Sequence, residues 1–387
     1  MKIAVFTDTY EPQVNGVVSV LESILPRLAK GNEVILFAPG NGSKMRMEQK
    51  GGITIYWAPA SPFPFYEGYL MSAVAPREID RVLKKEKPDI VHAHAPVLLG
   101  LQGILVAKRK KIPIVATYHT HFPDYLPYLL DGKLPGFLSP ISTKTVEGLI
   151  RLVFSLADVS TAPTQELVNE LKSYGVKNAV VLANGVDLSS MKADAKLCEE
   201  FREKNNIPEG KKIILYVGRV GFEKRLNVLL DAVKKMEAKD FVLVVVGSGP
   251  QMENYRQYAA GRGLMNVVFT GFVDKKTLPA AYASAHVFAS ASDSETFGLT
   301  FIEAMALGVP VIGVNRLGPK ELINDGKNGF LVEPGDSSTM AKRLDQLLSD
   351  NALRKRMSAS AREMAEKFSI ERSVEETLSI YRKLVKK

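Results

Sequence analysis

The sequence has 387 residues, more than one ordinary hydrophobic core accommodates, so we expect two or three domains. Its single cysteine, Cys198, excludes a disulfide within the chain and a zinc site built from cysteines. The net charge of +9 is spread along the chain, which argues against a nucleic-acid partner and suits anionic small molecules or an anionic membrane surface.

The chain shows no segment that would place it in or across a membrane. No apolar run approaches the roughly 20 residues that a membrane span requires. The first residues, "MKIAVFTDTY", enter a strand without the pattern of a signal peptide. We therefore expect a cytoplasmic protein.

Short apolar strands alternate with helical patterns along most of the chain, and runs such as "EVILFAP" are typical of parallel strands covered on both faces. Residues 1–187 predict one doubly wound α/β domain, and the polar, strandless residues 188–210 predict a connection. The alternation restarts in 211–365, and 366–387 form an amphipathic helix that we expect to pack back on the first domain. Since such sheets bind ligands beyond the carboxyl ends of their strands, we expect two Rossmann-like domains facing an interdomain cleft.

The first strand leads into "TDTYEPQVNGVVSV", where Asn15 fits an N-cap and Gly16 opens a helix. The free N–H groups of such a helix start suit a phosphate. A single glycine is not the G-x-G-x-x-G dinucleotide fingerprint, and an ordinary capped helix is the alternative.

Four histidines form two H-x-H pairs, His92 with His94 and His119 with His121. In a strand, residues i and i+2 share a face, so these pairs raise the possibility of a metal hydrolase. Such a site needs further histidine or carboxylate ligands, for which we find no pattern, so we expect no metal and no cofactor. His119, at the end of a predicted strand, is the best single functional candidate.

The first strand of the second domain ends in "GRVGFEKR", which places Arg219 and Lys224 in a glycine-containing loop. Two cations on such a loop suit a diphosphate, and a solvated basic turn is the alternative. Lys224 also lies where a helix is expected to begin. Because a cation there opposes the helix dipole, we expect an anion beside it.

The stretch "SDSETFGLTFIEAMALGVPVI" carries two glutamates eight residues apart, Glu295 and Glu303. The pattern predicts a loop, a helix that ends at Gly308, and a buried strand. Glu295 would then precede the helix and Glu303 would lie one to two turns inside it. The alternatives are that Glu295 only caps the helix and that Glu303 only lies on a solvated helix face. The chain has no D-x-D pattern for a metal-bound diphosphate.

Taken together and in order, these stretches resemble the retaining glycosyltransferases of the GT-B fold, specifically family 4. The E-x7-E pattern of "ETFGLTFIE" is the most specific element, and "GRVGFEKR", "TYEPQVNGV", "ANGVD" and the "GFV" at 271–273 agree with it. The resemblance covers nearly the whole chain. Arg225 departs from it, since many members have a small residue after "EK".

The resemblance implies roles for single residues at a nucleotide-sugar donor. Glu295 would bond the sugar hydroxyls of the donor, and Glu303 would hold its ribose hydroxyls. Backbone N–H groups would reach the sugar and phosphate from Phe297, Gly298 and Leu299.

The diphosphate would be bound by Arg219 and Lys224, helped by Gly16 of the other domain. Phe272 and Val273 would contribute backbone contacts to the base. His119 would approach the hydroxymethyl group of the donor sugar. The catalytic set implied by the resemblance is thus His119, Glu295, Arg219 and Lys224, acting without a metal by stabilising the leaving diphosphate.

The acceptor is suggested by "HTHFPDYLPYL", which resembles the branch of the family that glycosylates diacylglycerol or related lipids. An aromatic stretch and a basic cluster could hold the first domain on an anionic bilayer. Their residues are Phe63, Phe65 and Tyr66, and Lys108, Arg109, Lys110 and Lys111.

The predicted activity is therefore transfer of a hexose to a lipid hydroxyl by a monomer that acts peripherally at the cytoplasmic face of a membrane. Three alternatives stay open: transfer to a soluble sugar or sugar phosphate, a nucleotide-sugar 2-epimerase, and a non-catalytic protein that binds sugar nucleotides.

Overall fold

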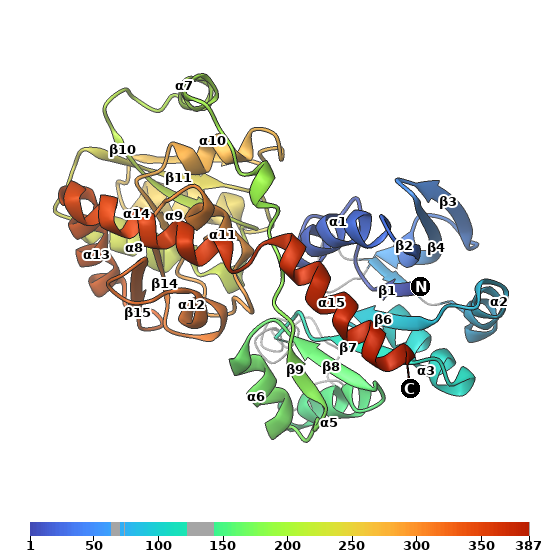
Figure 1. Ribbon diagram of the computed structural model, residues 1–387. Coiled ribbons are helices and arrows are strands. Elements are labelled where there is room, and N and C mark those ends of the chain that lie inside the picture. The colour runs from blue at the N-terminus through green and yellow to red at the C-terminus, as the bar shows by residue number, and fades with distance from the viewer. Residues whose placement is uncertain (63–69, 73, 122–142, 387) are drawn as a thin grey trace, which may run out of the picture. The chain divides into compact units, whose positions relative to one another are not determined.

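The computed structural model describes residues 1–62, 70–72, 74–121 and 143–386 (Figure 1). The chain divides into two compact units. Unit 1 contains Met1–Gly185 and Ile370–Lys387, and unit 2 contains Val186–Ser369.

Unit 1 is built on one twisted sheet whose described strands run in the order β3-β4-β2-β1-β6-β7-β8-β9, with β5 paired to the end of β4. All neighbours are parallel except the β3–β4 and β4–β5 pairs, which are antiparallel. The strands are β1 (Lys2–Thr7), β2 (Glu33–Gly40), β3 (Arg46–Lys50), β4 (Ile53–Pro62), β5 (Leu70–Ser72), β6 (Ile90–His94), β7 (Ile114–Thr117), β8 (Val159–Ala162) and β9 (Ala179–Val181).

The helices that connect these strands are α1 (Gly16–Leu28), α2 (Pro76–Glu86), α3 (Leu99–Lys110), α5 (Thr143–Phe154) and α6 (Gln165–Ser173). A further helix, α15 (Ile370–Val385), returns from the end of the chain and lies beside α1 and β6 (Figure 1). Its residues Ile370 and Tyr381 are buried in the same apolar core as Leu21 and Leu25 of α1. The end of the chain therefore belongs to the fold of unit 1.

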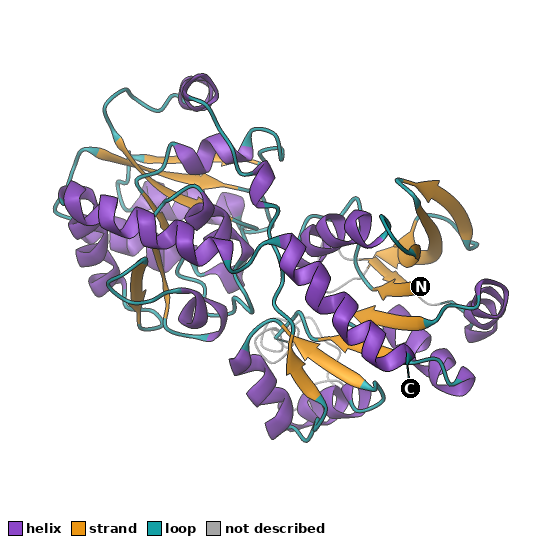
Figure 2. Ribbon diagram, viewed as in Figure 1, coloured by secondary structure: helices purple, strands orange, loops and turns teal. Residues whose placement is uncertain are grey.

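Unit 2 contains a parallel sheet in the order β12-β11-β10-β13-β14-β15, with helices between successive strands (Figure 2). The strands are β10 (Lys212–Val217), β11 (Phe241–Val246), β12 (Val267–Gly271), β13 (Val287–Ala289), β14 (Val311–Val314) and β15 (Gly329–Val332). The helices are α7 (Ala195–Lys204), α8 (Leu226–Lys235), α9 (Met252–Gly261), α10 (Leu278–Ala283), α11 (Leu299–Ala306), α12 (Leu317–Leu322), α13 (Ser337–Ser349) and α14 (Asn351–Glu366), with short 3-10 turns η2 (Leu188–Ser190) and η3 (Phe222–Lys224).

Two mainly parallel α/β sheets are the fold that the alternating pattern predicts. The inner strands β1 and β10 are buried over most of their length, and β11 (Phe241–Val246) over all of it, because helices cover both faces. One boundary differs from the prediction. Residues 188–210 are not a separate connection, since they form η2 and α7 within unit 2, and α7 packs against α10.

Within the described ranges, no helix combines the length and the apolar character needed to span a membrane.

Candidate active site

Most predicted site residues of unit 2 lie in loops at one edge of its sheet, whereas Leu299 and Glu303 belong to α11. Arg219 follows β10, Phe272 follows β12 and Glu295 follows β13, and Arg316, which the sequence did not single out, follows β14. Because these strands are parallel, their carboxyl ends meet at the same edge, where ligands of such sheets bind.

The loop that carries Arg219 is held by the turn that follows β11. The backbone N–H of Val220 donates to the carbonyl of Ser248 at 2.9 Å, and that of Gly218 donates to Val246 at 3.0 Å. A Cβ at Gly247 would lie 1.9 Å from the Gly218 carbonyl oxygen, so only glycine permits this approach. The "GSGP" turn therefore supports the arginine loop. Arg219 is half-buried; this burial lowers the pKa of its guanidinium, and the charge of Glu223 opposes that shift.

Lys224 ends the 3-10 turn η3, and α8 begins two residues later at Leu226, so the helix that we expected at Lys224 starts slightly further on. The preceding residue, Glu223, is buried, and its carbonyl accepts hydrogen bonds from the hydroxyls of Ser292 (3.3 Å) and Ser294 (3.2 Å). These bonds tie the loop of Lys224 to the loop of Glu295.

The ammonium group of Lys224 lies 2.6 Å from Glu295 Oε1. The two side chains are only 17% and 19% exposed, so solvent screens the pair weakly. Burial lowers the pKa of Lys224, but the charges of Glu295, Tyr216 and Glu223 outweigh burial, and the net shift is upward. Glu295 is therefore the anion expected beside Lys224. The resemblance had assigned these two residues to different parts of a ligand, whereas here they bind each other.

A second ion pair lies next to the first. Arg225 Nε is 2.9 Å from Asp293 Oδ2, and Arg316 donates to the Asp293 carbonyl at 2.7 Å. Arg225, whose role the sequence left open, adopts a left-handed backbone conformation with φ +45° at the start of α8. It thus adds a third cation to the loop that holds Arg219 and Lys224.

The loop between Glu295 and α11 is shaped by close backbone contacts. Gly318 N donates to the Glu295 carbonyl at 2.9 Å, and a Cβ at Gly318 would lie 2.2 Å from the Phe297 carbonyl oxygen. Gly298 is the N-cap of α11, and no side chain caps the helix there. The N–H groups of the first turn, which begins at Leu299, therefore lack the side-chain acceptor that usually closes a helix start. Leu307 and Gly308 end α11, as the pattern predicts.

Glu303 is half-buried in the second turn of α11, where its Oε2 accepts a hydrogen bond of 2.6 Å from the hydroxyl of Tyr282. Burial raises the pKa of Glu303 to about 7, while the bond from Tyr282 and the charge of Lys275 act in the opposite direction. The two glutamates thus have chemically different partners in the structure. Glu295 is paired with a cation, and Glu303 with a neutral donor.

The "GFV" segment reaches the same edge from β12. Gly271 ends the strand, the Phe272 side chain is 61% exposed and Val273 is half-buried. Exposed aromatic surface beside a strand end suits stacking against a flat ring.

In unit 1, Gly16 opens α1 at the carboxyl edge of the sheet, and Asn15 caps the helix through a 3.1 Å bond from Val18 N. The neighbouring helix start, at α3, is already occupied by a buried carboxylate. Asp8 accepts hydrogen bonds from four backbone N–H groups: Val97, Leu98, Leu99 and Gly100 at 2.7–3.0 Å. Sequence reasoning did not single out Asp8, although a carboxylate directly after a buried strand could have drawn attention to it.

The histidines of unit 1 form a buried stack. His94 Nδ1 lies 2.8 Å from His119 Nε2, and the rings of His92 and His94 are 4.0 Å apart. His92 in turn bonds the Tyr381 hydroxyl and the Thr117 hydroxyl, each at 2.6 Å. Burial lowers the pKa of His92 to about 3 and that of His119 to about 4, and it lowers the pKa of His94 well below its usual value.

His121 does not join this stack, since its Nε2 lies 3.0 Å from Glu170 Oε2. Across the residues that the structure describes, no three His, Cys, Asp or Glu side chains are arranged to hold a metal ion.

The predicted membrane residues are placed only in part. The aromatic residues Phe63, Phe65 and Tyr66 lie outside the described ranges. The basic cluster Lys108–Lys111 ends α3 and begins the turn to β7, at the amino edge of the sheet. Asp80 of α2 pairs with Lys110 at 3.1 Å and with Arg109 at 3.6 Å, so one of the four charges is offset.

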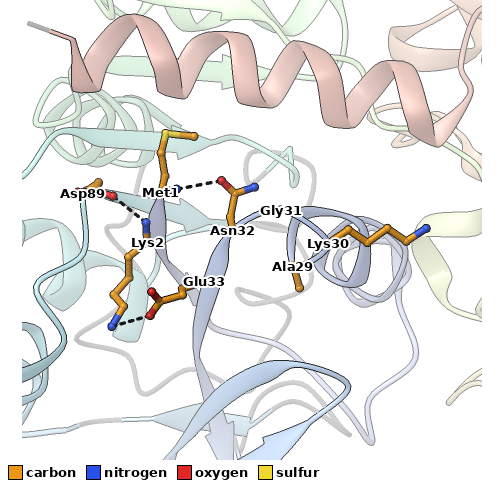
Figure 3. A pocket seen from close by; sticks show the side chains of 8 residues that line it. All are labelled: Met1, Lys2, Ala29, Lys30, Gly31, Asn32, Glu33 and Asp89. Carbon is orange, nitrogen blue, oxygen red and sulfur yellow. Dashed lines mark hydrogen bonds and ion pairs between the residues drawn. The ribbon is translucent and has the colours of Figure 1, made fainter.

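Hollows open among the described residues of unit 1. One, of about 520 Å³, lies at the amino edge around Met1, Lys2, Asn32 and Glu33 (Figure 3). Several of its charged groups already have partners, since Lys2 Nζ is 2.9 Å from Glu33 and the amino group of Met1 donates to Asn32.

The second hollow, of about 240 Å³, lies at the opposite, carboxyl edge, and its lining combines Trp57 and two prolines with polar groups. The lining residues are Glu11, Pro12, Pro39, Gly40, Asn41, Arg46, Trp57 and Leu70.

Comparisons with known proteins match both units to glycosyltransferase families. Residues 14–190 match the family described as Glycosyltransferase Family 4, and residues 198–364 match the family described as Glycosyl transferases group 1. The chain is 33% identical to the sulfoquinovosyl transferase SQD2 of Arabidopsis thaliana over 87% of its own length and 64% of that protein's length. It is 32% identical to an alpha-monoglucosyldiacylglycerol synthase of Streptococcus pneumoniae, with coverage of 86% and 75%.

Among solved structures, HepE of Anabaena in complex with UDP superposes with a TM-score of 0.79 at 20% identity and covers 99% of this chain and 100% of its own. At that identity the likeness shows the fold. The protein is thus an enzyme of the glycosyltransferase class, and the chain belongs to the GT-B glycosyltransferases that join a family 4 domain to a group 1 domain.

Proposed function

We propose that the enzyme is a retaining glycosyltransferase that moves a hexose from a nucleoside-diphosphate sugar to a hydroxyl of a diacylglycerol-type lipid. The observation that carries the proposal is the Lys224–Glu295 pair, which lies in the loops at the carboxyl edge of the unit 2 sheet together with Arg219 and the uncapped start of α11. A buried cation held by a carboxylate is ready to exchange that partner for a diphosphate.

In the proposed complex, the diphosphate takes the ammonium group of Lys224 and the guanidinium of Arg219. Glu295 is then released to accept hydrogen bonds from the hydroxyls of the sugar. Glu303 holds the ribose hydroxyls, and the backbone around Phe297, Gly298 and Leu299 donates to the sugar and phosphate. Phe272 and Val273 lie against the base. For Gly16 and His119 of unit 1 we propose contacts with phosphate and with the sugar hydroxymethyl group.

The chemistry proposed for this arrangement needs no protein nucleophile. The bond from the anomeric carbon to the β-phosphate oxygen breaks, and its electron pair stays on the diphosphate. The acceptor oxygen bonds the anomeric carbon on the same face and passes its proton to a phosphate oxygen. Since negative charge grows on the diphosphate in the transition state, fixed cations and N–H dipoles lower the barrier more than they tighten ground-state binding.

Two kinds of observation support a lipid acceptor. Of the two relatives compared above, one is named as a synthase of monoglucosyldiacylglycerol, and the other is named for the transfer of a sulfoquinovosyl group. The 240 Å³ hollow at the carboxyl edge of unit 1 is lined by Glu11, Asn41 and Arg46, polar groups that suit a small hydroxylated head group, whereas Trp57 is only 7% exposed and its indole N–H already donates to Glu48.

The test is an assay with radiolabelled sugar nucleotides, each incubated with and without a diacylglycerol-containing lipid extract. We expect one donor to label a lipid product whose anomeric configuration, read by NMR, matches that of the donor. Glu295→Gln should abolish labelling. An inverted product would refute the retaining mechanism. Release of an epimerised free sugar, or transfer to a soluble sugar with no lipid present, would refute the acceptor.

A further inference from the structure

The buried hydroxyl of Tyr282 is directed at the carboxylate that we propose binds ribose. We infer that Tyr282 is a positioning residue that fixes the orientation of Glu303 and stabilises the ionised form of its carboxylate, so that donor affinity depends on pH. This inference rests on the proposed function of Glu303.

The geometry leaves the Tyr282 side chain little freedom. Tyr282 belongs to α10, its side chain is fully buried, and its ring packs 6.2 Å from that of Phe288. Phe288 in turn packs edge-on against Phe301 of α11, with ring centroids 4.9 Å apart. The aromatic packing therefore joins α10 to α11, and it sets the direction of the hydroxyl that donates to Glu303 Oε2 at 2.6 Å.

The hydrogen bond from Tyr282 occupies one of the two oxygens of the Glu303 carboxylate. In the part of the chain that the structure describes, Tyr282 is the hydrogen-bond donor to Glu303, and it takes Oε2. Oε1 and the second lone pair of Oε2 stay available for ligand hydroxyls. Without the phenol, the carboxylate could rotate about its last bond, and both oxygens would have to be ordered when the ligand binds.

The charged groups around Glu303 come from several elements. Tyr282 of α10 and Lys275, in the segment before α10, both favour the ionised form, whereas burial opposes it and dominates, which leaves the pKa at about 7. Of the other helices packed against α11, α12 carries Lys320 and Glu321. Arg362 of α14 donates to the Leu307 carbonyl at the far end of α11, at 3.1 Å.

The sign of the pH effect follows from these partners. Hydrogen bonds from hydroxyls to an ionised carboxylate are stronger than those to a neutral acid, so ribose binding should be tightest above the pKa and weaken as pH falls through 7. Removing the Tyr282 hydroxyl removes one stabiliser of the ionised form. The pKa of Glu303 must then rise, and the loss of affinity must begin at a higher pH.

The experiment measures binding of UDP, GDP and ADP, and of their 2′-deoxy analogues, by titration calorimetry from pH 6 to 9. The variant is Tyr282→Phe, which keeps the ring and removes only the hydroxyl. The matched control is Tyr258→Phe, since Tyr258 also donates to a carboxylate of unit 2, Asp231 at 3.0 Å, and belongs to α9. Thermal melting checks that each variant is folded.

We expect Tyr282→Phe to weaken the preferred nucleotide about tenfold at pH 7, the size of one hydrogen bond to a charged group, and to move the pH midpoint upward. The loss should be much smaller for the 2′-deoxy analogue, and kcat at saturating donor should change less than twofold. Tyr258→Phe should change none of these. On a Glu303→Gln background, Tyr282→Phe should cause no further pH shift, because the titrating group is gone.

An unchanged pH midpoint in Tyr282→Phe would overturn the inference, and so would an equal loss for ribose and deoxyribose nucleotides, which is what a merely structural role predicts. These results would leave the proposed function intact. If the wild-type enzyme binds none of the three nucleotides, or binds them equally well after Glu303→Gln, the proposed role of Glu303 fails and the inference fails with it.

Discussion

Lys224 and Glu295 illustrate how the partner of a residue decides what it can do. Each alone would be an unfavourable buried charge, and together they neutralise each other at 2.6 Å. In the proposed complex, a diphosphate replaces Glu295 as the partner of Lys224, and the released carboxylate gains sugar hydroxyls, so that neither group is left unsatisfied. Under this proposal, the pair preorganises the site before the ligand binds.

Replacing the cations should slow turnover far more than it weakens nucleoside binding. We expect Arg219→Ala and Lys224→Ala each to lower kcat about 10²–10³-fold, comparable to removing one donor from an oxyanion site. Steady-state kinetics with the preferred donor measures this. Lys211→Ala is the control, since Lys211 pairs with the exposed Asp240 at 2.9 Å. Unchanged kcat in both variants would eliminate the proposed diphosphate contacts.

How much of the site could be predicted depends on whether a residue's role is local. Asn15, Gly308 and the position of Glu303 inside a helix follow from patterns of a few residues, and the structure confirms them. Tyr282 and Asp8 were missed because their partners lie 21 residues or more away in the sequence. No local pattern announces such contacts, although a polar atom in an otherwise apolar helix is a hint.

At the scale of elements, the alternation of strands and helices predicted both sheets, because continuous apolar strands and polar turns are local signals. The pattern did not predict that 188–210 folds as part of unit 2, since α7 is polar along the sequence and owes its place to packing against α10. It also could not predict the histidine stack, which joins β6, the residues just after β7 and the returning helix α15 through His92, His119 and Tyr381.

The histidine stack should make unit 1 sensitive to mild acid. The folded-state pKa values of His92 and His119, about 3 and 4, lie below the ordinary value of 6.5, so the unfolded chain binds more protons. The stability that these groups contribute is fully present above pH 6.5 and is lost as pH falls towards 4. Each imidazole should add up to about 1.4 kcal/mol per pH unit.

Denaturant unfolding at pH 7.5, 6.5 and 5.5 measures this dependence. His94→Gln should lower the slope between pH 6.5 and 5.5 by up to about 1.4 kcal/mol per pH unit, because one titrating group is removed. The control is Glu170→Gln, because Glu170 pairs with His121, which lies outside the stack. Equal slopes in wild type and His94→Gln would show that the stack is not the source of the acid sensitivity.

At the scale of the whole molecule, the proposed chemistry relies on side-chain cations and backbone dipoles, and no metal takes part in it. Dialysis against a strong chelator should therefore leave the transfer activity unchanged. The assay is initial rate before and after dialysis, with added Mg²⁺, Mn²⁺ or Zn²⁺ as comparison. A loss of activity that Mn²⁺ or Zn²⁺ restores would contradict the mechanism and would favour a metal site at the histidine pairs.

Docking on a membrane depends on where the charges of the whole protein lie. The α3 helix runs from the carboxyl end of β6 to the start of β7, so its basic end lies at the amino edge of the sheet, about 18 Å along the helix from the edge that carries Gly16 and His119. The basic cluster can therefore attract a bilayer without taking part in the chemistry. A mutation of the cluster can therefore change attraction to the bilayer without changing catalytic turnover.

We therefore expect the Gln variant of Lys108, Arg109, Lys110 and Lys111 to bind anionic vesicles more weakly while its kcat for a detergent-solubilised lipid acceptor stays unchanged. Each basic residue near an anionic surface contributes about 1 kcal/mol, and Asp80 offsets one of the four. Wild-type binding, measured by vesicle sedimentation, should fall with added salt, because the attraction decays over about 8 Å at physiological ionic strength.

The matched control replaces three exposed lysines and one exposed arginine of unit 2: Lys342, Lys355, Arg356 and Lys367. Equal binding to neutral and anionic vesicles, or an equal loss in both variants, would show that the cluster at the end of α3 is an ordinary solvated helix end.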